Sequence, residues 1–226
     1  RLGVAATVHR DGLLTRVGRR TAEHLFLVLL SLLAAILCGV PLGILSARRP
    51  LAGQVILAVT GTIQTLPSLA LLVFLIPLLG IGPRPAIVAL FLYSLLPIVR
   101  GVFTGLLEIP SALRESAVAL GLSSRAQLFQ IELPLAARSI LAGIKTAAVI
   151  NVGTATVAAF VGAGGLGERI VAGLAVNDRE LMLAGALPAA LLALLVQALF
   201  GLLDRALTRG RHAGRATITG SGEPAP

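Results

Sequence analysis

The chain has 226 residues, of which 56% are hydrophobic and only 13% are charged, and its formal net charge is +9. Because soluble domains are about a quarter charged, this composition cannot cover a soluble surface. The mean hydropathy is +0.94, and the apolar residues form long runs, so lipid must be the solvent for most of the chain. The composition therefore predicts an integral membrane protein built from helices.

Five apolar runs are long enough to be membrane spans, which need about twenty residues each. The expected spans are residues 25–47, 54–80, 85–107, 136–161 and 181–203. The second run contains Pro67 at its middle, and neither half could cross a membrane alone. We therefore expect a single bent or broken helix there, and an all-α bundle of about five transmembrane helices.

The two ends of the chain differ from the spans. Residues 1–24 form an N-terminal segment in which residues 16–24 could be an interfacial helix, and the Gly-, Thr-, Ser- and Pro-rich residues 209–226 predict a disordered tail. The charge bias favours a cytoplasmic position for Arg48 and Arg49. The arginines before the first span would then lie outside, against the positive-inside trend, and the side of the N-terminus stays open.

The arginines cluster in connections and near both ends, a distribution that suits anionic lipid headgroups better than a nucleic-acid surface. No zinc-ligand spacing or pattern of stacking aromatic residues supports a nucleic-acid partner. None of the ten acidic residues lies at the centre of a span, which disfavours an ion-coupled carrier. Lys145 is the only lysine, so the chain has no P-loop. We expect Lys145 to snorkel toward the cytoplasm or to line a wet cavity.

The segment GAGGLG after the fourth span matches the spacing of a dinucleotide-binding loop. That interpretation requires a preceding strand, whereas these glycines end a membrane helix. We predict instead a turn at the outer end of the span, formed by Gly162, Gly164, Gly165 and Gly167. The sequence shows no clustered metal ligands and no nucleophile elbow, and thus no enzyme active site.

Residues 110–134 interrupt the apolar pattern with a polar, organised segment. Ser111 is expected to cap a helix that starts at residue 112, and Gly121 to end it in a left-handed conformation. A second helix is expected to open at Ser124, with Gln127 completing a capping box, and to stop before Pro134. Such a helical hairpin, held at both ends by membrane spans, is shaped for binding a partner.

This segment resembles the hallmark of the permease subunits of bacterial binding-protein-dependent ABC importers. That hallmark is EAA, three residues, Gly, nine residues and then I-x-L-P, and the matching residues here are Glu115, Ser116, Ala117, Gly121, Ile131, Leu133 and Pro134. Ser116 is the one departure. The resemblance implies a cytoplasmic coupling helix that docks into a separate ATP-binding subunit. The alternative is an amphipathic interfacial hairpin without a partner.

The stretches IQTLPSLALLVFLIPLLGIG and INVGTATVAAFVGAGGLGERIVAGLAVND are similar to the osmoprotectant branch, whose members import glycine betaine, choline, carnitine and proline betaine. The resemblance covers residues 12–208. Methionine-importer permeases share the five-span plan, so we expect their fold, and methionine or another small solute remains an alternative substrate. An ion-coupled carrier acting alone and a membrane scaffold without transport are the remaining alternatives.

The resemblance also implies the partners and the place of work. It predicts a second permease copy or paralogue, an extracytoplasmic substrate-binding protein, ATP bound by the partner subunit rather than by this chain, and the bacterial cytoplasmic (inner) membrane. Polar residues in the spans are candidates for the translocation path, although helix-to-helix hydrogen bonds would explain each of them too. These candidates are Gln64, Thr65, Pro67, Ser68, Asn151 and Thr154.

Overall fold

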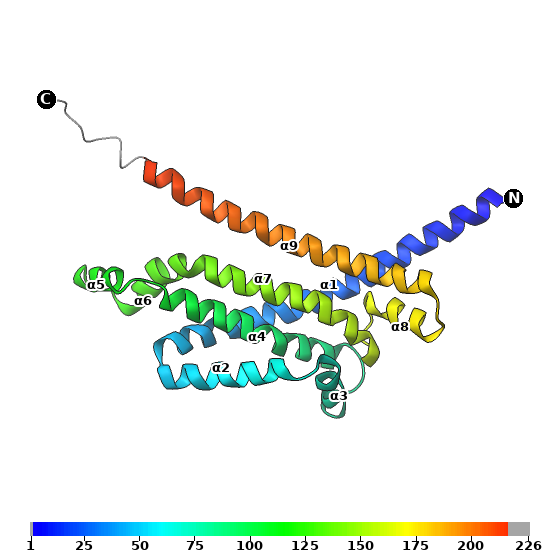
Figure 1. Cartoon of the computed structure of the whole chain (residues 1–226), viewed down its shortest axis with the longest axis horizontal. Helices are drawn as coiled ribbons and strands as arrows, with labels where there is room; N and C mark the ends of the chain where they lie inside the picture. Colours follow the sequence, from blue (N-terminus) through cyan, green and yellow to red (C-terminus); the bar gives the residue numbers. More distant parts are fainter. Residues whose placement is uncertain (1, 217–226) are drawn as a thin grey trace.

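The computed structural model describes the backbone of residues 2–216 and the side chains of residues 15 and 17–205, and in this part of the chain it contains helices and no strands. Figure 1 shows long helices lying side by side, with short helices at opposite ends of the bundle. In chain order the helices are α1 (Leu2–Arg48), α2 (Pro50–Thr65), α3 (Ser68–Leu79), α4 (Pro83–Leu107), α5 (Ser111–Ala119), α6 (Ser124–Ala126), the π-helix η1 (Gln127–Glu132), α7 (Leu133–Val157), the 3₁₀-helix η2 (Ala158–Val161), α8 (Gly167–Ala175) and α9 (Arg179–Ala216).

Within the described residues, four continuous helical stretches are long and apolar enough to cross a membrane, namely Val17–Arg48, Pro83–Leu107, Ser124–Val161 and Arg179–Arg205. The pair α2 and α3 passes the same test together and bends by 101° at its break. Counting this pair as one span gives five, as the sequence predicted. The broken helix at Pro67 is also confirmed.

The break between α2 and α3 is caused by Pro67, and hydrogen bonds connect it to α4. Proline drives the preceding residue into an extended conformation, and Leu66 has ψ 136°. Its freed carbonyl accepts a hydrogen bond from Tyr93 Oη, and Gln64 Nε2 donates to the Tyr93 carbonyl at 3.2 Å. The bend is therefore a defined structural element rather than a flexible interruption.

Helix α4 is the centre of the bundle. Of its most apolar stretch 56% is buried, against only 6% for that of α9, which lies on the periphery with a leucine-rich face exposed. Small residues let α4 and α7 cross at close range, which is how helices pack in lipid. A Cβ atom on Gly143 would lie 2.5 Å from the Pro97 carbonyl oxygen and 3.2 Å from Gly101 Cα.

Two predictions about the chain ends are wrong. Helix α1 continues without a break from Leu2 to Arg48, so residues 16–24 belong to the first long helix and do not form a separate interfacial one. Helix α9 extends to Ala216, so residues 209–216 are helical rather than disordered. The rest of the predicted tail, residues 217–226, lies outside the described residues.

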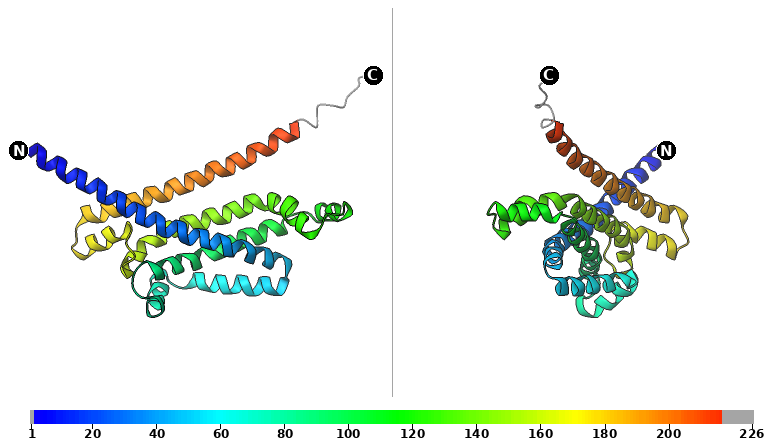
Figure 2. Two further views of the ribbon diagram at one scale, coloured as in Figure 1. Left: turned by 180° about the vertical axis from the view of Figure 1, so that it is seen from behind. Right: turned by 60° about the vertical axis from the view of Figure 1, so that its left-hand side comes forward.

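The start of α1 and helix α5 lie at opposite ends of the bundle (Figures 1 and 2). If α5 is cytoplasmic, Arg19 and Arg20 are external, which is the conflict with the positive-inside trend noted above. In the structure Arg19 pairs with Glu23, and Arg20 pairs with both Glu23 and Glu168. The charge of these arginines is largely neutralised by neighbouring carboxylates.

Candidate functional site

The turn after α5 is a Schellman motif that depends on Gly121. Gly121 has φ +74°, in the left-handed region that glycine adopts without strain. Its N–H donates to the Val118 carbonyl at 2.9 Å, and the N–H of Leu122 donates to the Ala117 carbonyl at 3.1 Å, the two bonds that define the motif. The predicted role of Gly121 in the turn is confirmed.

The helix caps of this segment differ from the prediction. Helix α5 begins at Ser111, and its N-cap residue is Pro110, with no side-chain hydrogen bond. The second helix is capped by Ser123 rather than Ser124, because Ser123 Oγ accepts from the Ala126 N–H at 3.3 Å. Gln127 donates from its side chain to the Leu122 carbonyl instead of completing a capping box. The cap lies one residue earlier than the sequence pattern indicated.

The second helix does not stop before Pro134. Helices α6, η1 and α7 run on without a gap from Ser124 to Val157. Proline lacks the N–H for an i→i−4 bond, and its ring clashes with the carbonyl four residues earlier. The π-helical turn relieves this clash by widening the helix, and the Leu133 N–H donates to the carbonyl of Leu128, five residues back. The segment after the glycine turn and the fourth span therefore form one continuous helix.

Helix α5 projects beyond the bundle with most of its surface uncovered (Figures 1 and 2). Ala117 is 2% exposed and packs inward, whereas Glu115 and Ser116 are exposed. Apolar side chains on the same segment are also uncovered, with Val118 63% and Leu120 80% exposed. Adjacent exposed apolar side chains on a helix that projects from the bundle indicate a surface for binding a partner.

The remaining predicted coupling residues connect this surface to the span. Ile131 and Leu133 are half-buried, and Pro134 is exposed at the start of α7. Between them lies Glu132, which the sequence analysis did not single out. Its side chain is only 12% exposed and forms ion pairs with Arg48 at the end of α1 and with Arg114 on α5, both at 3.3 Å. No spacing rule relates Arg48 and Glu132, which are 84 residues apart.

A groove of about 430 Å³ opens over the crossing of α4 and α7. Its polar lining comes from three helices and consists of Gln64, Arg100, Thr104, Ser139 and Thr146. Of these five residues, only Gln64 was predicted from the sequence. The i, i+4 spacing of Arg100 and Thr104 on α4 is a signal that could have revealed these two residues, since it places two polar groups on one face within a span.

The other predicted path residues do not line this groove. Asn151 is fully buried, and its Nδ2 donates to Ser31 Oγ on α1 at 3.0 Å, so it forms the helix-to-helix hydrogen bond that was the alternative explanation. Thr65 donates to the carbonyl of Thr62 at 2.7 Å. Pro67 is exposed, and Ser68 and Thr154 are half-buried. None of these three residues lines the groove.

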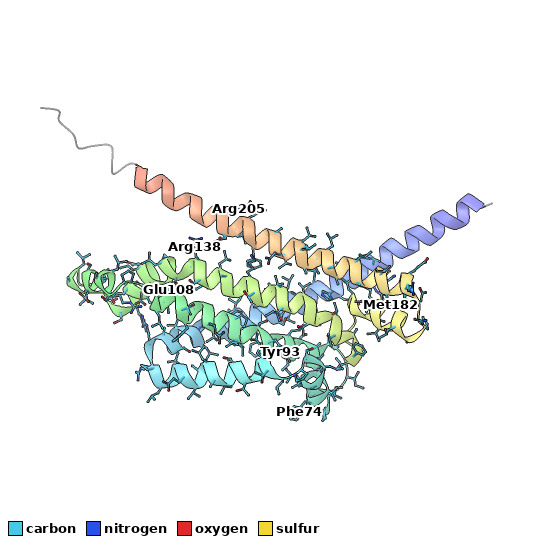
Figure 3. All side chains as sticks on the ribbon, in the orientation of Figure 1. Phe74, Tyr93, Glu108, Arg138, Met182 and Arg205 are labelled. Carbon is cyan, nitrogen blue, oxygen red and sulfur yellow. The ribbon has the colours of Figure 1, made fainter. Side chains whose placement is uncertain are left out.

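Lys145 lines a second groove, of about 500 Å³, between α7 and α9. Glu108, Arg138 and Asp204 contribute to the same lining, and Arg138 pairs with Asp204 at 3.3 Å. Figure 3 shows Glu108 and Arg138 near the end of the bundle that carries α5, with Arg205 close by on α9. Lys145 thus faces a polar groove, in agreement with the sequence-based expectation.

The predicted glycine turn is present at the opposite end of the bundle. Gly162, Gly164 and Gly165 have φ between +73° and +80°, whereas Gly167 begins α8, a short helix that the sequence did not predict. A side chain at Gly167 would overlap the Thr156 carbonyl. The Gly165 N–H donates to Glu23 Oε2 at 3.3 Å, which attaches the turn to α1.

The chain is similar to known membrane permeases along most of its length. It is 42% identical to the choline transport system permease protein OpuBB of Bacillus subtilis (strain 168), covering 84% of this chain and 87% of that protein. It is 46% identical to the glycine betaine/carnitine/choline transport system permease protein OpuCD of the same organism, covering 82% of each chain. It is also 42% identical to the osmoprotectant import permease protein OsmW of Salmonella typhimurium, covering 83% and 90%.

Solved structures agree with the fold. An inward-facing structure of the MetNI methionine ABC transporter matches with a TM-score of 0.76 and 27% identity, covering 86% of this chain and 96% of that one. An amino acid ABC transporter matches with a TM-score of 0.67 at 16% identity, which supports the fold alone. These matches confirm the predicted methionine-importer-permease-like fold.

The family model described as binding-protein-dependent transport system inner membrane component matches residues 39–209, which include residues 110–134 and four of the five spans. This chain therefore belongs to that family of bacterial inner-membrane permeases of ABC importers.

Proposed function

We propose that this chain is the permease subunit of an ATP-driven importer for a quaternary-ammonium osmoprotectant such as glycine betaine, choline or carnitine. The observation that carries the proposal is the identity of 42–46% to permeases whose names specify these solutes or osmoprotectants, over more than four fifths of the chain. The solved methionine transporter is more distant, at 27% identity. Osmoprotectants are therefore favoured over methionine.

The chain itself is proposed to be non-catalytic. ATP is bound and hydrolysed by a separate subunit that docks on α5, through Glu115, Ser116 and the neighbouring exposed apolar side chains. A substrate-binding protein delivers the solute to the opposite end, and a second permease copy or paralogue completes the path. Movement of the docked coupling helices rocks the bundle between outward- and inward-open states.

The groove over α4 and α7 is the proposed translocation path of this subunit. Arg100 is exposed there, seven residues before the end of α4 and hence about 10 Å inside the span. A guanidinium facing lipid at that depth is costly, so this face borders water or the second permease. By contrast, the exposed face of α9 is leucine-rich, as expected for a surface against lipid.

Transport assays with proteoliposomes test the substrate. The permease is reconstituted with the ATP-binding subunit and binding protein encoded beside it, with ATP inside the vesicles at the site of the ATPase. We expect accumulation of labelled glycine betaine, choline or carnitine, with mutual competition and no competition by methionine. Accumulation of methionine alone would contradict the substrate assignment while leaving the family assignment intact.

Thr146→Leu tests the path. Thr146 is exposed near the middle of α7 and donates to the Ala142 carbonyl at 2.9 Å, so leucine should leave the fold intact but obstruct the groove. We expect the initial uptake rate to fall about tenfold, equivalent to about 1.4 kcal/mol in the barrier. Thr62→Leu is the matched control, because Thr62 is also exposed and makes the same 2.9 Å bond, but outside the groove. Equal uptake by both variants would place the path elsewhere.

A further inference from the structure

Glu132 holds the coupling helix to the membrane bundle through a three-helix ion-pair junction. Among the described residues it is the only buried carboxylate, and a buried carboxylate is stable only when it is paired. One of its oxygens lies 3.3 Å from Arg48 Nη2 and the other 3.3 Å from Arg114 Nε. The second contact is an ion pair without hydrogen-bond geometry.

Arg114 extends the junction to a third span. Its Nη2 donates a hydrogen bond to the Leu106 carbonyl in the last turn of α4, where a cation is favoured by the helix dipole. In the described part of the chain, no other side chain of α5 has a hydrogen bond or ion pair to a residue outside α5. One side chain on the coupling helix thus reaches α4 directly, and it reaches α1 and the start of α7 through Glu132.

The junction bypasses the glycine turn. Along the backbone, α5 is connected to the fourth span only through the turn at Gly121 (φ +74°) and the residues that follow it, up to the start of α6 at Ser124. A displacement of α5 that distorts this turn would not reach the span through the backbone. The Arg114–Glu132 pair joins the first turn of α5 directly to the last residue of the π-helix and restrains the angle between these two segments.

We propose that Glu132 is a positioning residue that transmits movement of α5 to α1 and α7, through its ion pairs with Arg114 and Arg48. The proposal rests on the proposed function, since it requires an ATPase docked on α5. It goes beyond that function because it identifies a mechanical connection inside the permease. Breaking this connection should separate ATP hydrolysis from transport rather than abolish both.

The test is the number of ATP molecules hydrolysed per solute imported, measured with the complete transporter in proteoliposomes. For Glu132→Gln and Arg114→Gln we expect normal co-purification of the ATP-binding subunit and an increase in this ratio of about tenfold, within the range by which single substitutions change coupling between sites. The double variant should resemble either single one, because both remove the same interaction. Arg114→Lys keeps the charge and should recover most of the coupling.

Arg138→Gln is the matched control. Arg138 also forms a 3.3 Å ion pair, with Asp204, but this pair joins α7 to α9 and does not include the coupling helix. The ratio should stay at the wild-type value in this variant. If Glu132→Gln fails to fold, Arg114→Gln provides the test, because Glu132 then remains paired with Arg48.

Two results would overturn the proposal. One is a ratio for Arg114→Gln equal to that of Arg138→Gln, and the other is a parallel loss of hydrolysis and uptake, which indicates a merely structural role. A wild-type transporter that imports none of the solutes offered is a different failure. It would contradict the proposed function itself, and with it the inference that depends on that function.

Discussion

Glu115→Arg is expected to abolish retention of the ATP-binding subunit by the tagged permease while leaving the permease folded. Glu115 is exposed on the projecting helix α5, and among the described residues its side chain has no ion pair or hydrogen bond that the replacement would remove. Reversing a charge in a docking surface creates like-charge repulsion and leaves the partner's group unpaired, which should weaken binding by about 3 kcal/mol or more. Co-purification from membranes measures the effect.

The control for this experiment is Glu180→Arg. Glu180 is also exposed and lies at the start of α9, at the end of the bundle opposite to α5. This variant should retain as much of the ATP-binding subunit as wild type does. Retention by both variants would mean that α5 is not the docking surface, and the interfacial hairpin without a partner would become the better interpretation.

Gly143→Val is expected to cause the largest loss of stability among the substitutions considered. A Cβ atom at Gly143 would lie 2.5 Å from the Pro97 carbonyl oxygen and 3.2 Å from Gly101 Cα. Backbone atoms cannot move aside as a flexible side chain can, so α4 and α7 would have to separate. We expect destabilisation of about 3 kcal/mol, at the upper end for overpacking, seen as earlier loss of the monodisperse peak on heating in detergent.

Gly153→Val on the same helix is the comparison for Gly143→Val. A Cβ atom at Gly153 would have no heavy atom within 4 Å, so this variant should melt close to wild type. Similar melting of both variants would show that the close crossing of α4 and α7 does not contribute to stability as the packing indicates.

The features that sequence reasoning predicted correctly depend on local backbone rules. Proline restricts its own φ and its predecessor, so the break at Pro67 could be located. Glycine tolerates left-handed conformations, so the turns at Gly121 and at residues 162–165 could be located as well. In each case the physical cause lies within a few residues of its effect.

Of the features that sequence reasoning missed, those at Asn151 and Glu132 depend on contacts between distant segments, whereas the one at Pro134 is local. Whether Asn151 faces the groove or α1 is decided by the rotation of α7 about its axis, which the apolar pattern of a buried helix does not fix. The clash at Pro134 was expected to end a helix, but a π-helical turn accommodates it. The partners of Glu132 come from two other helices, and only the fold brings them together.

The most direct test of the central claim is whether solute flux requires the ATP-binding subunit. Proteoliposomes containing the permease with its ATP-binding subunit and binding protein should accumulate osmoprotectant when ATP is trapped inside, and not when ADP replaces it. Vesicles with the permease alone should show no flux above empty vesicles. Flux by the permease alone, insensitive to ATP, would contradict the account and identify the chain as a carrier or channel acting by itself.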